Sequence, residues 1–501
     1  MKKVLIFLKR HYPVLVLTIM VFLCVTFSSE CSFLYRTNEW GDAHCYHTVA
    51  MMMNNGKVLY RDIFEQKGPY LYFIHMAAIA IAPGKYYGMY LFELLFGWLF
   101  AFASYKTIRL FIENKAICVL SVCLSLTTYY LSMAFMQGDS VEEMMIPFYA
   151  LCLYWLIKMA KDIKDITWYE LLLSGAFCGL ALFSKFSLVP FFAGFGGAIF
   201  VLFCLKKKVA NGFLAGLFFF IGLGLASIPA LVYCGVYGIY GDLWQVYFYN
   251  NVFHYSAFQP SPIGEKFLRY FQAWGVRFFF GFNYFFFIVI GFFYIVFSKT
   301  IKKDKVFFSV LSTYIVLNLF ITLGGVNYQY YGLPNVIYTF IFVIALVDLL
   351  SKVKKPTEYI KKHAKPLAAI TMAIFAIITF AGNLNMPRMF LKEDELLVYH
   401  MKKHIEKRKN ATVLMYGHLD IGVYYLCDIM PTTKYFTGLN GDFAELKKEQ
   451  QRIVDEGEVT FVIVRQGYMP ERIETHYYEA TRFSFSDLMH TDTFYLFEHK
   501  A

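Results

Sequence analysis

The chain has 501 residues, of which 58% are hydrophobic and 17% are charged, and its mean hydropathy is +0.48. Soluble domains are about 45–50% apolar and about 25% charged, so this composition excludes a soluble, disordered or collagen-like protein. Ten cysteines in 501 residues exclude a small disulfide scaffold. Because the apolar runs are continuous rather than alternating, the sequence predicts a polytopic α-helical membrane protein.

The positive charge predicts the orientation of the chain. Four basic residues, Lys2, Lys3, Lys9 and Arg10, precede the first apolar run, and the net charge of the whole chain is +11. Lysine and arginine mark cytoplasmic loops, so this excess indicates membrane orientation rather than nucleic-acid binding. We therefore expect a cytoplasmic N-terminus and an uncleaved first helix.

Apolar runs separated by alternating basic gaps predict about eleven transmembrane helices and an extracytoplasmic C-terminus. The expected spans are 14–29, 88–105, 116–136, 141–158, 169–184, 187–205, 211–234, 278–298, 306–323, 335–350 and 367–382. The run 69–82 is short for a crossing and is expected to be an external helix at the membrane surface. The pair Gly222 and Gly224 is expected to serve helix packing.

Two external segments are expected, a loop at 30–87 and a tail at 387–501. The tail holds roughly a third charged residues and a slight acidic excess, whereas residues 1–386 are mostly apolar and basic. The sequence thus predicts a transmembrane domain, 1–386, and a small C-terminal α/β domain, 387–501. The tail pattern predicts strands at 411–416, 459–464 and 493–498, and helices at 419–427, 442–456 and 472–482.

Charged and aromatic residues gather in the first loop and at one later boundary. The loop segment 38–70 contains Glu39, Asp42, Tyr60, Arg61, Glu65 and Lys67. The second cluster contains Asp139, Glu142 and Glu143, where the third span is expected to reach the outer face. Carboxylates at a membrane boundary are costly unless they are paired or hydrated, so both clusters indicate a functional site on the outer face.

The order of these motifs resembles that of the GT-C glycosyltransferases, in particular glycosyltransferase family 39. That group includes the protein O-mannosyltransferases and the bacterial lipid A aminoarabinose transferases. The motifs are G-D-A-x-x-Y at 41–46, N-G-K-V-x-Y-R-D-x-F-E-x-K-G-P at 55–69, Q-G-D at 137–139 and the aromatic stretch 327–334. The chain departs from the usual pattern at Gly68, in place of a proline, and at Gln329, where a histidine is frequent.

The resemblance implies an inverting glycosyltransferase that takes a sugar from a polyprenyl-phosphate carrier. Such a leaving group needs cations to stabilise its charge rather than an acid to protonate it. The acceptor hydroxyl, in turn, needs a base. The implied roles are Asp42 as base, Asp139 as second acid, Lys67, Arg61 and Tyr60 as phosphate or donor contacts, and Glu39, Glu65, Tyr328 and Tyr330 as acceptor or sugar contacts.

Structural alternatives stand beside these roles. Asp42 and Asp139 could cap helices, Lys67 could be an interfacial lysine, and Arg61 could pair with Asp62 or Glu65. The tyrosines could belong to the aromatic belt at the membrane interface. The pair His44 and His47 has helical spacing but no matching third ligand, so no metal site is predicted, although a divalent metal stays open.

The main alternative function is a lipid-linked-sugar transporter or flippase. Transporters usually show paired halves and polar sites at the membrane midplane, whereas here the polar residues gather at one face. The expected partners are a polyprenyl-phosphate-linked sugar, a cell-envelope acceptor (glycan, lipid or protein) and membrane lipids, with no nucleic acid. The expected location is the plasma membrane, and the composition favours a bacterial source.

Overall fold

The computed structural model describes residues 2–254, 262–299, 304–322, 328–352, 358–359, 362–439, 441, 443–486 and 491–500. Asn327 of the late aromatic motif and Asp442, where a helix was expected to begin, lie outside this range. The chain divides into two compact units. Unit 1 comprises Met1–Leu34, Tyr90–Pro229 and Pro262–Met386, and unit 2 comprises Tyr35–Met89, Ala230–Ser261 and Pro387–Ala501. Most of the expected first loop therefore groups with the tail.

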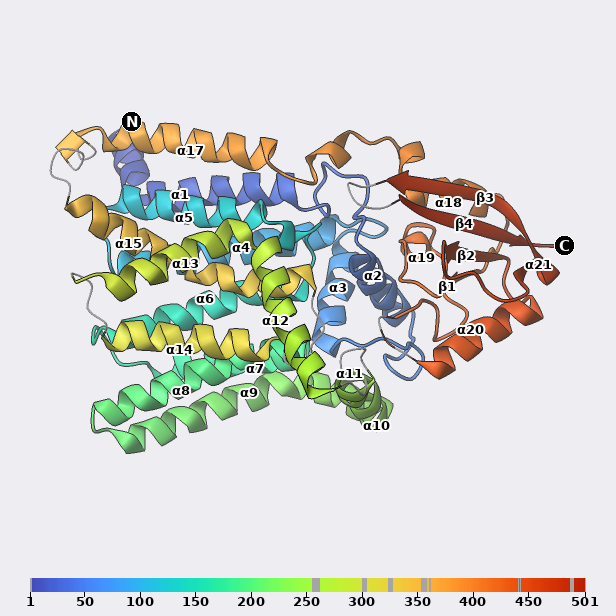
Figure 1. The fold of residues 1–501 in the computed structure, drawn as a ribbon, viewed down its shortest axis with the longest axis horizontal. Helices are drawn as coiled ribbons and strands as arrows, with labels where there is room; N and C mark the ends of the chain where they lie inside the picture. Colours follow the sequence, from blue (N-terminus) through green and yellow to red (C-terminus); the bar gives the residue numbers. More distant parts are fainter. Residues whose placement is uncertain are drawn as a thin grey trace. The chain divides into compact units, whose positions relative to one another are not determined.

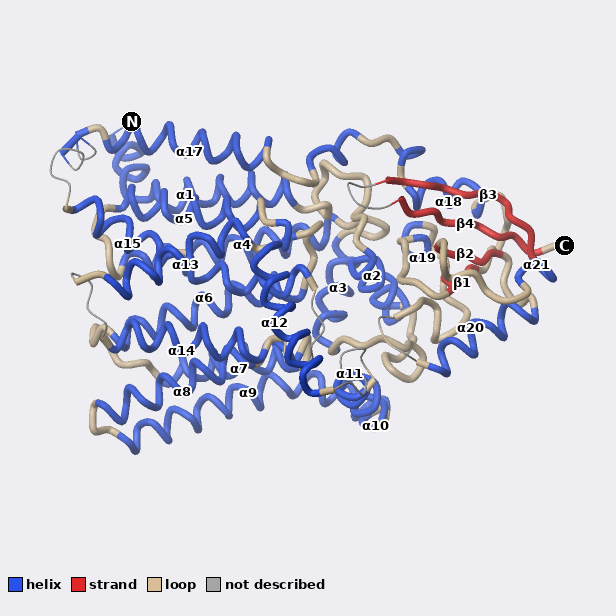
Figure 2. Tube along the Cα trace, viewed as in Figure 1, coloured by secondary structure: helices blue, strands red, loops and turns tan. Residues whose placement is uncertain are grey.

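Unit 1 is helical, as Figures 1 and 2 show. Polar caps begin several of its helices: the Asn114 side chain accepts the first free N–H groups of α5, Ser140 caps α6, and Thr167 and Glu170 form a capping box at α7. The α-helices are α1 (Lys2–Ser28), α4 (Tyr87–Arg109), α5 (Lys115–Tyr130), α6 (Val141–Ala160), α7 (Trp168–Leu182), α8 (Pro190–Leu205), α9 (Val209–Tyr237), α12 (Ile263–Phe280), α13 (Phe282–Phe297), α14 (Lys305–Phe320), α15 (Phe340–Ser351) and α17 (Ala364–Ala381). Short 3₁₀ segments are η1 (Met133–Phe135), η2 (Phe186–Leu188) and η5 (Gln329–Tyr338). The ranges of α4 and α9 each cross the division between the units.

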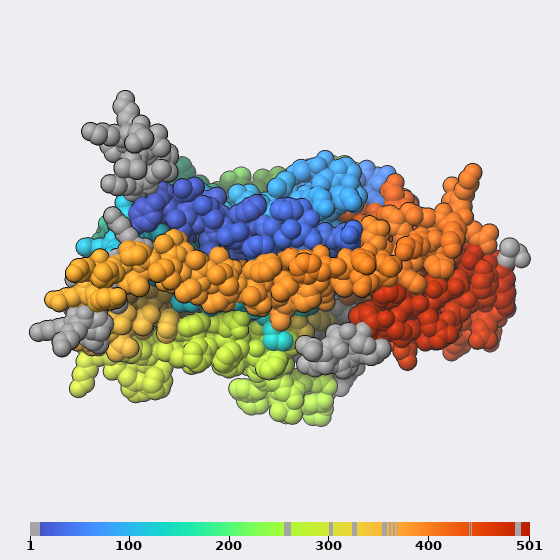
Figure 3. Space-filling view, turned by 90° about the horizontal axis from the view of Figure 1, so that it is seen from above, coloured from blue at the N-terminus to red at the C-terminus, as the bar shows by residue number. Residues whose placement is uncertain are grey.

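Helices distant in sequence pack against one another within unit 1. Helix α5 contacts both α1 and α17, and α17 lies along α1 (Figure 3). Helix α8 packs on α14. The α7 and α9 backbones meet at glycines, since a Cβ atom on Gly222 would lie 1.9 Å from the Leu172 carbonyl oxygen. Gly222 is thus required for close packing, whereas a Cβ on Gly224 would meet no described residue within 4 Å.

Five described helical segments are long and apolar enough to cross a membrane, and the number rises to seven if each of two bent helix pairs is one span. The five are His11–Ser28, Tyr87–Arg109, Val141–Ala160, Phe186–Leu205 and Val209–Tyr237. The bent pairs are α12 with α13, at 103°, and η5 with α15, at 42°. The other four expected spans coincide with shorter apolar helices, Lys115–Tyr130, Trp168–Leu182, Lys305–Phe320 and Ala369–Ala381. The expected total of eleven spans is therefore not confirmed, because these four fall below the length of a typical crossing.

Unit 2 combines the first-loop helices with a small mixed sheet, drawn red in Figure 2. Its helical segments are α2 (Gly41–Asn54), α3 (Pro69–Ile81), α10 (Tyr240–Asp242), the π-helical η3 (Leu243–Tyr249), α11 (Asn250–Phe253), η6 (Met386–Phe390), η7 (Glu393–Glu395), α18 (Leu397–Ile405), α19 (Val423–Leu426), α20 (Ala444–Glu456) and α21 (Ile473–His476). The strands are β1 (Val413–Tyr416), β2 (Phe461–Arg465), β3 (Tyr477–Ser486) and β4 (Thr491–His499). The sheet order is β1-β2-β4-β3, with β1 and β2 parallel and the other pairs antiparallel.

The sheet confirms a small α/β element in the tail but corrects one expected helix. The expected helix 472–482 is a single turn, α21, followed by β3. Here Tyr478, Thr481 and Phe483 pair with β4, and aromatic and β-branched residues favour strands once a partner strand is present. The expected helix 419–427 shrinks to α19, because Gly422 adopts φ +88° and its N–H bonds to the Asp420 side chain.

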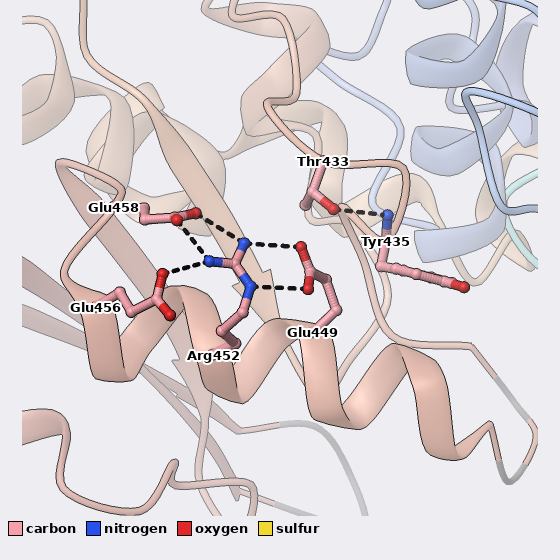
Figure 4. Close-up of polar contacts among 6 residues, drawn as sticks. All are labelled: Thr433, Tyr435, Glu449, Arg452, Glu456 and Glu458. Atoms are coloured by element: carbon pink, nitrogen blue, oxygen red, sulfur yellow. Dashed lines mark hydrogen bonds and ion pairs between the residues drawn. The ribbon is translucent and has the colours of Figure 1, made fainter.

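The core of the tail lies between the sheet and α20. Its buried members are Leu414, Ile453, Val454, Val459, Val462, Val464, Ile473, Tyr477 and Phe497. On the exposed face of α20, Arg452 binds Glu449, Glu456 and Glu458 (Figure 4). Nearby, the Thr433 hydroxyl accepts the Tyr435 N–H at 3.2 Å. The Arg452 network is solvated, so it contributes little to the stability of the fold.

Candidate functional site

Asp42 lies in the first turn of α2, and its side chain is buried. The helix begins at Gly41, after Trp40 in an extended conformation. One turn on, the Tyr46 hydroxyl donates to the Asp42 carboxylate at 3.4 Å. The positive end of the helix dipole stabilises a carboxylate in this position. Asp42 is thus a buried acid in the first turn of the helix rather than its cap, because the N-cap position belongs to Trp40.

The segment after α2 is organised around the buried carboxylate of Glu65. One oxygen of this carboxylate accepts the Lys67 N–H at 2.9 Å and the Tyr72 hydroxyl. The Tyr60 hydroxyl donates to the Lys67 carbonyl at 2.8 Å. Tyr60 itself has φ +68°, and burial raises its pKa well above the usual range. The structure therefore brings Tyr60, Glu65 and Lys67 together, with two side chains fixing the Lys67 backbone.

The remaining candidates of the first loop are more exposed. Arg61 forms an ion pair with the adjacent Asp62 at 2.9 Å, as its structural alternative predicted. Asp62 also accepts the Val58 N–H at 2.9 Å, so the pair closes a turn of the loop. Glu39 precedes α2 and lines a pocket of unit 2 together with His44.

The two histidines of α2 are engaged within unit 2. The His44 Nδ1 atom lies 2.6 Å from the Tyr86 hydroxyl oxygen, and the His47 Nδ1 donates to the Ala43 carbonyl at 3.0 Å. Burial lowers the pKa of His44 to about 3 and that of His47 well below its usual range. Both imidazoles are therefore neutral, and one ring nitrogen of each has a protein partner.

Asp139 lies in unit 1 at the centre of a buried acidic cluster. It has φ +63°, and its N–H is shared between Glu93 Oε1, at 2.8 Å, and Glu143 Oε2, at 3.1 Å. Glu93 also accepts the Ser29 hydroxyl at 2.5 Å. The preceding Gly138 has φ +86°, a conformation that residues with a Cβ atom rarely adopt, and a Cβ there would also lie 2.5 Å from Glu93 Oε1. Asp139 is therefore not the helix cap; Ser140 caps α6 instead.

A second group in unit 1 joins a buried ion pair to aromatic rings. Lys185 Nζ lies 2.5 Å from Glu142 Oε1, and it lies over the Tyr331 and Tyr330 rings, 4.1 and 4.8 Å from their centroids. Tyr328 stacks on Tyr330 with a centroid separation of 5.5 Å. A cation among aromatic faces is favourable when it is desolvated. The two tyrosine candidates thus belong to a cation-binding aromatic cluster.

Sequence reasoning missed Glu93 and Lys185. Each is a lone charged residue within or between strongly apolar runs, and such residues are costly unless they have a structural or functional partner. That signal could have identified both residues, but their partners depend on tertiary contacts. Of the predicted site residues, Asp42, Tyr60, Arg61, Glu65, Lys67 and Glu39 lie in unit 2, whereas Asp139, Tyr328 and Tyr330 lie in unit 1.

Comparison with known proteins confirms the resemblance to the GT-C glycosyltransferases. Residues 66–233 match the family described as dolichyl-phosphate-mannose-protein mannosyltransferase, a range that includes Lys67 and Asp139 but begins after Asp42 and Arg61. No curated protein matches the chain.

Among solved structures, the chain is similar to ArnT from Cupriavidus metallidurans bound to undecaprenyl phosphate. The TM-score is 0.60 at 9% identity, over 97% of this chain and 98% of that one. The apo state of the same protein gives 0.59 at 10% identity, over 95% and 96%. The archaeal oligosaccharyltransferase AglB from Archaeoglobus fulgidus, in complex with an inhibitory peptide and a dolichol-phosphate, gives 0.49 at 11% identity, over 97% of this chain and 74% of that one. At these identities, the similarity to ArnT shows a shared fold.

Proposed function

We propose that this protein is an inverting GT-C glycosyltransferase that transfers a sugar from a polyprenyl-phosphate carrier to an acceptor at the outer face of the membrane. The family match over residues 66–233 carries the proposal, since it covers both Lys67 and Asp139. The fold shared with ArnT over nearly the whole chain supports it. We further propose a bacterial plasma-membrane location, with the N-terminus cytoplasmic and the C-terminus extracytoplasmic.

In this reaction the acceptor oxygen forms a bond to the anomeric carbon while the bond from that carbon to the phosphate oxygen breaks. The polyprenyl phosphate leaves with the electron pair, and the acceptor hydroxyl loses its proton. Asp42 takes that proton, because it is a buried carboxylate in the first turn of α2. Displacement from the opposite face inverts the anomeric centre.

The leaving phosphate requires positive charge rather than a proton donor. Lys67 supplies this charge. Hydrogen bonds from its backbone to the Glu65 and Tyr60 side chains hold its Cα in place and so position its side chain. Arg61 supplies a second, more exposed cation from its pair with Asp62. An arginine suits bidentate phosphate contact, and a lysine acts as a point charge.

Asp139 orients the sugar or the acceptor from within the acidic cluster of unit 1. Its φ of +63° and the two bonds to its N–H fix its backbone. Glu39, Tyr328 and Tyr330 contribute contacts to sugar or acceptor. No protein-bound cofactor is proposed.

The test is sugar transfer by the full chain reconstituted in lipid, offered radiolabelled polyprenyl-phosphate sugars and, separately, nucleotide sugars. Asp42→Asn should lower transfer by roughly 10²–10⁴-fold, the usual contribution of a general base. Lys67→Ala should lower it at least about tenfold, since a hydrogen bond to a charged group is worth about 1.5–3 kcal/mol. Asp394→Asn and Lys57→Ala, which change exposed residues, are the matched controls.

Turnover of a polyprenyl-phosphate sugar that both site variants lose and both controls keep would support the proposal. Turnover of nucleotide sugars alone would refute the donor class. Lipid movement without turnover of any donor would favour a lipid-linked-sugar flippase instead.

A further inference from the structure

Unit 1 contains a pocket of about 210 Å³ between α13, α14 and α15. All but two of its lining residues are apolar, and they include Phe292 and Ile295 of α13, Phe307 and Val310 of α14, and Phe340 and Ile344 of α15. The side chains of Phe292, Phe307 and Ile344 are only half-buried, so the pocket opens at the surface of the helical unit. In a membrane protein, hydrocarbon fills such an opening more favourably than water does, because the wall is apolar.

The pocket lies at the end of unit 1 where basic loops meet. Its two charged lining residues are Lys161, which directly follows α6, and Asp304, which directly precedes α14. Beside them, Asp162 binds both Lys206 and Lys305 at 3.0 Å, so the loops before α7 and α9 are joined to the start of α14. Basic loops mark the cytoplasmic side of a membrane protein, so the pocket faces the inner leaflet in the proposed orientation.

Lys161 differs from neighbouring lysines in what its ammonium group contacts. Lys158 and Lys305 lie 2.5 and 3.0 Å from a carboxylate oxygen. Within the described part of the chain, no carboxylate lies at ion-pair distance from Lys161, whose Nζ is instead 4.3 Å from the Phe111 ring centroid. Phe111 in turn stacks on Phe340 of the pocket wall, with centroids 6.2 Å apart. Lys161 is thus a half-buried cation held against the apolar wall, and its charge is available to an anion.

The charge of Asp304 serves the helix that it precedes. Its Oδ1 accepts the Val306 N–H at 3.0 Å, so Asp304 caps α14 and its charge faces the positive end of the helix dipole. The lining therefore presents an apolar wall with Lys161 as its available cation. A ligand that uses both features has a hydrocarbon chain and an anionic head, since a small anion would leave the wall unused and a neutral hydrocarbon would leave Lys161 unpaired.

We propose that this pocket binds an anionic glycerophospholipid of the inner leaflet. One acyl chain lies against α13, α14 and α15, and the lipid phosphate accepts a hydrogen bond from the Lys161 ammonium. Basic pockets between transmembrane helices on the cytoplasmic side are suited to anionic lipid head groups. The assignment to the inner leaflet rests on the proposed orientation of the chain, whereas the choice of ligand rests on the pocket alone.

The test is native mass spectrometry of the full chain, released from a non-ionic detergent and titrated with phosphatidylglycerol or with phosphatidylcholine of the same acyl chains. The wild type should bind its first phosphatidylglycerol about fivefold more tightly than phosphatidylcholine, the usual contribution of one basic residue to the binding of an anionic lipid. Lys161→Gln should remove this preference. Ile344→Trp, which fills the pocket and keeps the cation, should weaken the binding of both lipids.

The matched control is Lys164→Gln, because Lys164 is an exposed lysine of the same loop and lies outside the pocket lining. A wild type without lipid preference would overturn the proposal, as would an equal loss of preference in Lys161→Gln and Lys164→Gln. If Ile344→Trp does not fold, the two lysine variants decide.

Two competitors separate the phospholipid from other sources of phosphate. Displacement of phosphatidylglycerol by millimolar glycerol 3-phosphate would overturn the proposal, because the pocket would then bind a free anion. Binding of undecaprenyl phosphate that Lys161→Gln weakens as strongly as that of phosphatidylglycerol would also overturn it, since the carrier lipid would then occupy the pocket. The measurement needs no turnover, so a wild type that turns over no donor would refute the proposed function without deciding the ligand of this pocket.

Discussion

Asp420 provides a quantitative prediction about the pH dependence of stability. It is buried where the tail packs on α2, and it accepts the Thr48 hydroxyl at 2.7 Å and the Gly422 N–H at 2.9 Å. Burial raises its pKa from the ordinary 3.8 to about 6, despite these hydrogen bonds. We consider the variant Asp420→Asn, whose carboxamide oxygen can accept the same N–H while the Thr48 hydroxyl turns to accept from the amide.

The sign follows from proton uptake. Between about pH 4 and 6 the folded protein keeps the Asp420 proton while the unfolded chain has released it, so the contribution of this group to the unfolding free energy falls as pH rises. The shift of about two pKa units corresponds to about 3 kcal/mol. His44 and His418, whose pKa values burial lowers to about 3 and about 4, act in the opposite direction, but both are present in wild type and variant.

The assay is thermal unfolding of wild type and Asp420→Asn in nanodiscs from pH 4 to pH 7. The Tm of the variant relative to wild type should rise with pH, by roughly 6–12 °C if unit 2 unfolds as one body of about 200 residues. Asp428→Asn, at an exposed position just after α19, should show no such trend. A Tm difference that stays constant across this range would refute the reasoning that Asp420 is a destabilised buried carboxylate.

Three further changes test the packing of each unit by thermal unfolding in nanodiscs. Gly222→Ala should lower the unfolding free energy by about 1–3 kcal/mol, since its new methyl group meets a backbone carbonyl of α7. Gly224→Ala should have little effect, and equal effects of the two substitutions would contradict the packing argument. Glu93→Ala should lower the unfolding free energy by about 2 kcal/mol or more, because the Ser29 hydroxyl loses its acceptor and the Asp139 N–H loses one of its two acceptors. Glu113→Ala, at an exposed site, should leave stability nearly unchanged. Arg452→Ala should shift Tm by no more than about 2 °C, because its three glutamate partners are solvated (Figure 4); a larger shift would mean that the network supports α20.

Local sequence patterns determined the helical membrane character, the position of the sheet-containing tail and several helix starts. The acids Glu142 and Glu143 indicate the first turn of α6, because they stabilise the positive end of the helix dipole, although the N-cap is Ser140 rather than the expected Asp139. The motif at 55–69 likewise identified Lys67 as a candidate, and the structure holds its backbone between Tyr60 and Glu65.

The tertiary structure decided features that depend on distant partners. Residues 477–482 form a strand because β4 lies beside them to complete their hydrogen bonds, although their local pattern is compatible with a helix. The structural roles of Glu93 and Lys185 follow from their contacts with Asp139 and Glu142, which belong to other segments of the chain. The pocket of unit 2 that Glu39 and His44 line is likewise assembled from α2, α18, α20 and all four strands of the sheet. A local sequence pattern reflects burial and hydrogen bonding within one helix or strand. The partner of a buried charge or of an edge strand comes from a distant segment of the chain, so it is known only once the segments have packed together.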